Sequence, residues 1–220
     1  LANPPVNGLG QSTRAGIVDG LAQANADAAV KAVVIIGSGK VFCGGADIRE
    51  FGSPKAFAAP DLHVTIAAVD GPVRAGGIGI MAACDLAVVN SAVTFALTEV
   101  RIGVAPAIIS LPILARCNWS SLAAAWLTGE PFDAQAARSM GLVTHVADDV
   151  MATVAQLVQG VLAGAPNAVA EAKRVLRGGQ PDMAAMVELS DRLFRSDEAA
   201  EGMRAFAEKR PPRWSPEAER

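Results

Sequence analysis

The sequence predicts an α/β fold whose body is followed by a helical C-terminal region. Through residue 146, short apolar runs of strand length alternate with segments in which apolar residues recur every three to four positions. After residue 146 only the helical spacing continues. We therefore place an α/β core at residues 1–163 and a helical oligomerisation region at residues 164–220.

The expected elements follow one another at short intervals. A helix over residues 12–29, capped by Ser12 or Thr13, precedes a buried strand at residues 33–36. The remaining elements of the core are expected at 64–69 (strand), 77–84 (helix), 86–90 and 94–96 (strands), 106–116, 120–128 and 133–140 (helices) and 142–146 (strand). The later helices are expected at 148–162, 167–177, 183–195 and 197–209.

Composition excludes several classes of function. The net charge is −3, only 19% of residues are charged, and no basic block suggests a nucleic-acid surface. No apolar run is long enough to span a membrane, and no signal-peptide pattern is present. Three cysteines without metal-ligand spacing favour reduced thiols and a cytoplasmic protein. The opening Leu1-Ala-Asn-Pro-Pro lies in the middle of an element, so we expect residues to precede it.

Two glycine-containing turns, each leading into a helix, are the most informative local pattern. In the first, Gly44 and Gly45 follow the strand at 33–36 and precede Ala46-Asp-Ile-Arg-Glu50, which could open a helix. The second covers residues 71–79. Unpaired N–H groups at a helix start can stabilise a developing negative charge. The pattern therefore predicts a site that polarises one carbonyl.

Two other glycine motifs are weaker interpretations. The residues from Gly77 to Ala82 fit a dinucleotide fingerprint, with Glu99 at a suitable distance downstream. That fingerprint must follow a strand directly, whereas residues 70–74 intervene here. The run Gly37-Ser-Gly-Lys lacks both the earlier glycine and the following Ser or Thr of a phosphate loop. A nicotinamide oxidoreductase is therefore a distant alternative.

With both turns in place, the chain resembles the crotonase (enoyl-CoA hydratase/isomerase) superfamily. The matching pieces occur at residues 3–7, 42–50, 71–85, 95–103, 127–130, 136–143 and 196–211, in the family's order and spacing. The resemblance implies a spiral of ββα turns that binds acyl-CoA thioesters and assembles as homotrimers, often paired into hexamers. It implies no metal and no separate cofactor, because CoA arrives as part of the substrate.

The resemblance also implies roles for individual residues. The thioester oxygen would be held by the N–H groups of Ala46 and Gly76. Residues implied in acyl-CoA binding are Cys43, Ala46, Asp47, Ile48, Gly76, Gly77, Phe206 and Lys209, the last two near the nucleotide end and sometimes across a subunit boundary. From the residues alone, Cys43 is a small pocket-wall residue, and Asp47 is a helix cap or first-turn acid.

The acid–base pair departs from the family's pattern. Hydratases commonly carry two glutamates; the second corresponds to Glu99, but the position of the first is Gly79. We expect hydration of a 2-enoyl-CoA through Glu99, with double-bond isomerisation as the alternative, because one carboxylate can move a proton between two carbons. A non-catalytic acyl-CoA-binding protein is a further alternative, motivated by Gly79 and by a link between Glu50 and Gly71 that is shorter than in relatives. Taken alone, Glu99 would be interpreted as a surface charge paired to Arg101.

Overall fold

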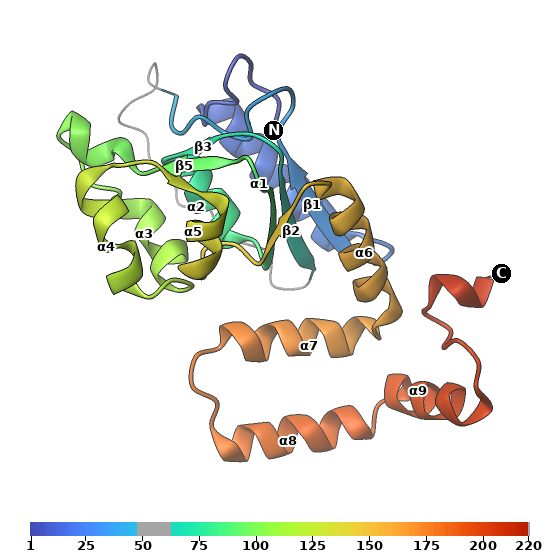
Figure 1. The fold of residues 1–220 in the computed structure, drawn as a ribbon. Coiled ribbons are helices and arrows are strands. Elements are labelled where there is room, and N and C mark those ends of the chain that lie inside the picture. Colours follow the sequence, from blue (N-terminus) through green and yellow to red (C-terminus); the bar gives the residue numbers. More distant parts are fainter. Residues whose placement is uncertain (48–62, 220) are drawn as a thin grey trace.

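A four-stranded parallel sheet forms the centre of the computed structural model, which describes residues 1–47 and 63–219 (Figure 1). Its strands lie in the order β1 (Ala32–Ile36), β2 (Val64–Val69), β4 (Leu86–Asn90) and β7 (His145–Ala147). Every residue of β2 is buried, because β2 is an inner strand and both of its faces are covered. A continuous apolar run is the sequence typical of such a strand.

A smaller three-stranded sheet stands beside it, in the order β3 (Val73–Arg74), β5 (Thr94–Ala96) and β6 (Phe132–Asp133). β3 and β5 run parallel, and β5 and β6 antiparallel. The guanidinium of Arg74 donates to the backbone oxygen and the hydroxyl of Thr94, which ties β3 to β5. β3 and β6 were not predicted, because two residues are too short to show a periodicity.

Helices cover both faces of the four-stranded sheet. The helices of the body are α1 (Gln11–Ala26), α2 (Gly76–Ala83), α3 (Ala107–Leu114), α4 (Trp119–Thr128), α5 (Ala134–Ser139) and α6 (Val150–Ala163), and η2 (Thr98–Ile102) is a 3₁₀ helix. α2 is buried from Gly77 to Ala83 and lies within the main core, whereas α6 closes a second apolar cluster with β2 and β4. Because α2 is packed on all sides, its orientation and the direction of its N-terminal N–H groups are held by the core.

Several predicted element boundaries differ from the structure. Neither Ser12 nor Thr13 caps α1: the N-cap is Gly10, whose carbonyl accepts from the N–H of Arg14, and both candidates lie inside the helix. The same helix ends at Ala26 because Asp27 is already extended. The last strand of the body pairs with β4 only from His145 onward, so it begins three residues later than the predicted 142–146.

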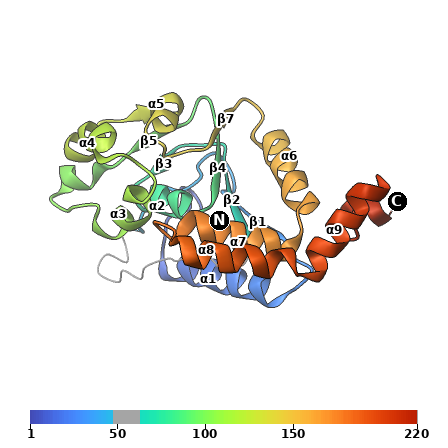
Figure 2. The same ribbon diagram turned by 90° about the horizontal axis from the view of Figure 1, so that it is seen from below.

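Three further helices form an arm that extends from the body: α7 (Pro166–Arg177), α8 (Met183–Phe194) and α9 (Asp197–Glu208) (Figures 1 and 2). The last short helix is η3 (Pro216–Glu219). The indole N–H of Trp214 donates to Ala163 at the end of α6, which returns the C-terminal segment to the start of the arm. An α/β body with C-terminal helices confirms the predicted fold class. The division at residue 163 coincides with the end of α6, and its reading as a domain boundary stays a prediction.

Candidate active site at the N-terminus of α2

The two glycine turns meet where α2 begins. Isolated bridges pair Leu9 with Ala46 and Cys43 with Val73, so the first turn lies between the N-terminal segment and β3. The N–H of Arg74 donates to the carbonyl of Cys43 at 3.0 Å, and the N–H of Gly44 donates to the carbonyl of Val6 at 2.8 Å. Segments thirty residues apart in the sequence are thereby held side by side.

The backbone at this junction is unusually tight. Gly45 has φ +100°, and a Cβ placed on it would lie 3.0 Å from the Cβ of Ala75. Ala75 itself, the N-cap of α2, has φ +46° and ψ −119° although it is not glycine. Such a conformation costs on the order of 1–3 kcal/mol and persists only where the surroundings enforce it. The strain lies at the position that sets the direction of the first N–H groups of α2.

The backbone nitrogens of Ala46 and Gly76 both lie at this junction. A Cβ built on Gly76 would lie 3.7 Å from the backbone nitrogen of Ala46. Within residues 1–47 and 63–219, neither N–H group has a protein acceptor, as the first residues of a helix have no intrahelical partner. Ala46 is exposed and Gly76 half-buried, so a ligand can reach both. Two such donors can stabilise an anionic oxygen.

Glu99 lies in η2, which follows β5, and the end of β5 contacts this junction. The N–H of Ala75 donates to the carbonyl of Ala96 at 3.2 Å, and Glu99 follows three residues later in η2. Its Oε2 is buried without a hydrogen-bond partner in the described part of the chain. Burial raises the pKa of this carboxyl above its ordinary value, more than the hydrogen bond from its own backbone lowers it. A carboxyl group with one oxygen left without a partner and a raised pKa is suited to accept or donate a proton.

Arg101 does not pair with Glu99. Its guanidinium binds the carboxylate of Glu130 at 2.6 Å and the carbonyl of Thr128 at 2.9 Å, both at the end of α4. The interpretation of Glu99 as one half of a surface pair with Arg101 is therefore wrong, because Arg101 is bound to Thr128 and Glu130 instead.

Cys43 and Gly77 pack against each other under the junction. Cys43 is fully buried, and burial raises the pKa of its thiol to about 11, so the thiol stays protonated and is not poised as a nucleophile. A Cβ on Gly77 would lie 2.7 Å from the Cβ of Cys43. Asp47 is half-buried at the end of the described segment. Ile48, the helix expected after Ala46, and most of the link between Glu50 and Gly71 lie outside the described residues.

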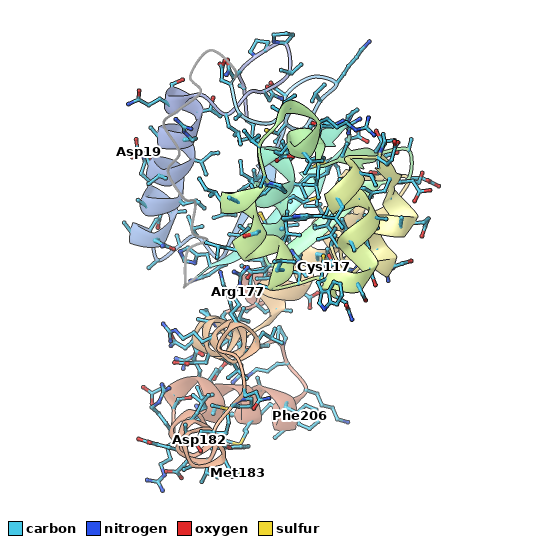
Figure 3. All side chains as sticks on the ribbon, turned by 90° about the vertical axis from the view of Figure 1, so that its left-hand side faces the viewer. Asp19, Cys117, Arg177, Asp182, Met183 and Phe206 are labelled. Atoms are coloured by element: carbon cyan, nitrogen blue, oxygen red, sulfur yellow. The ribbon has the colours of Figure 1, made fainter. Side chains whose placement is uncertain are left out.

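Phe206 and Lys209 lie on the arm, apart from the junction. The side chain of Phe206 in α9 is 87% exposed, and Figure 3 shows it below the body, beyond Arg177. Lys209 is the exposed C-cap of the same helix, with φ +53°. Within one chain the structure does not bring either residue to Ala46, Gly76 or Glu99.

The opposite end of α2 carries a cluster of charges that sequence reasoning missed. Asp85 accepts from Arg177 at 2.7 Å, from Lys173 at 3.0 Å and from the N–H of Thr65 at 2.8 Å. Arg116 and Arg177 also donate to the carbonyls of Cys84 and Ala83, at 2.9 and 2.7 Å. Although burial acts to raise it, Thr65 and the two cations hold the pKa of Asp85 below its usual value. In the sequence Asp85 stands beside Cys84, and no local pattern indicates Lys173 or Arg177 as its partners.

The described ranges contain neither a metal-binding cluster nor a membrane-spanning helix. Among residues 1–47 and 63–219, no group of three or more His, Cys, Asp or Glu side chains is placed to hold a metal ion. None of the helices described there has the length and apolar character needed to cross a bilayer.

Comparison with known proteins places the chain in a family. The sequence model of the enoyl-CoA hydratase/isomerase family matches residues 1–217. The mevalonyl-coenzyme A hydratase of Aspergillus fumigatus is 33% identical over 214 residues, covering 86% of this chain and 79% of the relative. A crystal structure of an enoyl-CoA hydratase from Mycobacterium avium is 39% identical with a TM-score of 0.68, covering 94% and 88% of the two chains. An enoyl-CoA hydratase/isomerase structure from Marinobacter aquaeolei reaches a TM-score of 0.83 at 28% identity, covering 94% and 90%. The chain thus has the predicted crotonase fold and belongs to the enoyl-CoA hydratase/isomerase family.

Proposed function

We propose that this chain carries out acid–base chemistry on an acyl-CoA thioester, with hydration of a 2-enoyl-CoA as its leading reaction. The observation that carries the proposal is the proximity of two acceptor-free N–H groups, from Ala46 and Gly76, beside the segment that bears Glu99, whose Oε2 is buried without a partner in the described part of the chain. Family membership and the hydratase names of the relatives support the same substrate class. CoA enters as part of the substrate, and the chain's own groups do the chemistry.

In this proposal the thioester oxygen accepts hydrogen bonds from the two N–H groups. The Glu99 carboxylate removes a proton from water while the water oxygen forms a bond to C3, and the electrons of the double bond move to the thioester oxygen as an enolate. Protonated Glu99 then returns the proton to C2, so that one water is added and the carboxylate is regenerated. The raised pKa of Glu99 favours this second step, because a weaker acid holds its proton until the enolate takes it.

Double-bond isomerisation is the second candidate, and a specific observation favours it. The only titratable side chain on α2, β5 and η2 that is not engaged elsewhere within the described chain is Glu99, because α2 carries none and Arg101 is bound to Glu130. One carboxylate is enough to take a proton from C2 of a 3-enoyl-CoA and to return it to C4, with no water added.

We further propose that the chain assembles as a homotrimer or a pair of trimers. The arm supports this, because several of its large apolar side chains are exposed in the single chain: Leu176, Met183, Val187, Phe194, Met203 and Phe206. Assembly would also give Phe206 and Lys209 a route to the substrate of a neighbouring copy. Light scattering of the protein as it elutes from a size-exclusion column gives the mass of the assembly. A mass of three or six chains is expected.

The first experiment is an absorbance assay with crotonyl-CoA and with a 3-enoyl-CoA, on the wild-type chain and on Glu99→Gln. Hydration removes the conjugated enoyl absorbance, and isomerisation creates it. Because a positioned acid or base contributes about 10²–10⁴-fold, Glu99→Gln is expected to lose that factor in kcat for whichever reaction occurs.

The control is binding of a saturated acyl-CoA, which both proteins are expected to retain because the N–H donors are unchanged. Binding without turnover of either substrate by the wild-type chain would contradict the proposal and favour a non-catalytic acyl-CoA-binding protein. Turnover that survives in Glu99→Gln would show that Glu99 is not the general acid and base.

A further inference from the structure

Ile109 lies directly over Gly79, in the packing between α3 and α2. A Cβ built on Gly79 would lie 2.5 Å from Cγ2 and 2.9 Å from Cβ of Ile109, and 3.5 Å from its Cα. Cβ contacts shorter than 3.0 Å essentially do not occur, so no side chain fits at position 79 while Ile109 stays in place. Because the Ile109 Cβ is itself one of the close atoms, a change of rotamer cannot relieve the contact.

This contact lies one helical turn inside the start of α2. Gly76 and Gly79 are three residues apart, so they lie on the same side of the helix, separated by a rise of about 4.5 Å. The facing elements bring no charge to this place: α2 reads Gly-Gly-Ile-Gly-Ile-Met-Ala-Ala, and α3 reads Ala-Ile-Ile-Ser-Leu-Pro-Ile-Leu. The contact between α2 and α3 at Gly79 is therefore apolar.

We infer that Ile109 is a specificity-determining residue, because its side chain excludes a second acid–base group from position 79 and leaves Glu99 to carry every proton. The inference rests on the proposed function and deepens it. Water addition benefits from a second polar group that orients the water, whereas the transfer of a proton from C2 to C4 needs one carboxylate alone. With glycine required at position 79 by Ile109, hydration proceeds here without a second polar group to orient the water.

The test compares the ratio of hydration of crotonyl-CoA to isomerisation of a 3-enoyl-CoA in a matched set of variants. Ile109→Gly is the required opening, because alanine would keep the Cβ at 2.9 Å while glycine leaves only the Cα at 3.5 Å. Gly79→Glu in that background supplies the acid, and Gly79→Gln in the same background fills the same volume without one. We expect the hydration ratio of the Glu pair to exceed that of the Gln pair by about 10²-fold, the lower end of what a positioned acid or base contributes.

Urea unfolding of the same proteins tests the steric premise separately from activity. Gly79→Glu is expected to lower the unfolding midpoint strongly when Ile109 is present and only weakly when position 109 is glycine. Equal shifts in the two backgrounds, or equal hydration ratios for the Glu and Gln pairs, would overturn the inference. If the Glu pair does not fold, the shorter Gly79→Asp and Gly79→Asn in the Ile109→Gly background make the same comparison.

The two proposals fail in different ways. A wild-type chain that turns over neither substrate overturns the proposed function, and with it the consequence of Ile109 for hydration, whatever the unfolding data give. A wild-type chain that is active through Glu99, together with unfolding shifts that do not depend on residue 109, leaves the proposed function standing and overturns the role of Ile109.

Discussion

The two ends of α2 treat their polar groups in opposite ways. At the C-terminal end, Asp85 accepts from Lys173, Arg177 and Thr65, and Arg116 and Arg177 cover the last carbonyls. At the N-terminal end, the N–H of Gly76 has no acceptor within the described chain, and a neighbouring carboxylate oxygen of Glu99 is buried without a partner there. Cations at a helix C-terminus and acceptor-free N–H groups at its N-terminus both follow the helix dipole.

The difference separates a part of the fold that holds α2 in place from a part that is available for chemistry. Native proteins satisfy nearly all buried polar groups, so a saturated cluster such as that of Asp85 is the ordinary outcome of folding. Unsatisfied groups cost free energy and remain where a ligand completes them. The opposite pKa shifts of the two carboxyls, lowered for Asp85 and raised for Glu99, express the same contrast.

The largest effect on stability is expected from Asp85→Ala at the saturated end. The side chain of Lys173 is only 7% exposed and would lose its carboxylate partner. Removing one partner of a buried ion pair typically costs about 3–5 kcal/mol, because the remaining charge is left uncompensated. Urea unfolding at neutral pH measures the loss. Asp85→Asn, which keeps an acceptor for the N–H of Thr65, should lose less; a loss below about 1 kcal/mol in Asp85→Ala would contradict the contrast.

Much of the body could be predicted from the sequence, because its signals are local. The bounds of β2, β4 and β5 were predicted to the residue from apolar runs, and α4 ends at Thr128 as expected. Glycines at 44, 45, 76 and 77 indicated two tight turns leading into helices. That the turns would meet at Ala46 and Gly76 came from the resemblance, since no local pattern relates residues thirty positions apart.

The rest of the site depends on contacts that the sequence does not display. In the sequence Ile109 is one apolar residue among several in a helix. Its importance follows from its contact with Gly79, which only the structure shows. The strained φ of Ala75 is imposed by its neighbours rather than by its own side chain. The pairing of Asp85 could not be predicted, because its partners Lys173 and Arg177 lie about ninety residues later, on α7. Side-chain pairing across such distances is decided by packing.

The next largest effect is expected from Gly45→Ala, with Gly39→Ala as its matched control. Both positions have positive φ, +100° and +74°, so alanine costs about 1–2 kcal/mol at either. Only at Gly45 does the new Cβ also approach another residue, the Cβ of Ala75 at 3.0 Å, whereas nothing lies within 4 Å at Gly39. Gly45→Ala should therefore lose more stability and also kcat/KM, while Gly39→Ala keeps its kcat/KM. Equal kcat/KM in the two variants would show that the backbone at Gly45 and Ala75 does not contribute to catalysis.

A smaller effect of opposite sign is expected from Glu99→Gln. The folded-state pKa of Glu99 is raised above 4.5, so ionising it destabilises the folded chain as the pH rises through 4.5 and through the folded-state pKa. Glutamine removes that ionisation, and the variant should be more stable than the wild type at neutral pH. The gain should disappear below about pH 4, where both side chains are neutral. Thermal unfolding across this pH range measures it, and a variant less stable than the wild type at neutral pH would mean that the carboxylate is satisfied after all.

The smallest effect on stability is expected from Arg101→Ala, two residues from Glu99 in the sequence. The ion pair of Arg101 with Glu130 is exposed, with side chains 47% and 69% accessible, so its loss should cost no more than about 1 kcal/mol. The sharper measurement is the pH dependence of kcat/KM, whose acidic limb reports the carboxylate that must be ionised. If Arg101 belongs to the α4 contact alone, that limb stays where it is in the wild type. If Arg101 instead stabilises the charge of Glu99, its removal moves the acidic limb of kcat/KM to higher pH. The contrast between the paired Asp85 and the Glu99 carboxyl would then no longer distinguish residues that hold the fold from residues that act in catalysis.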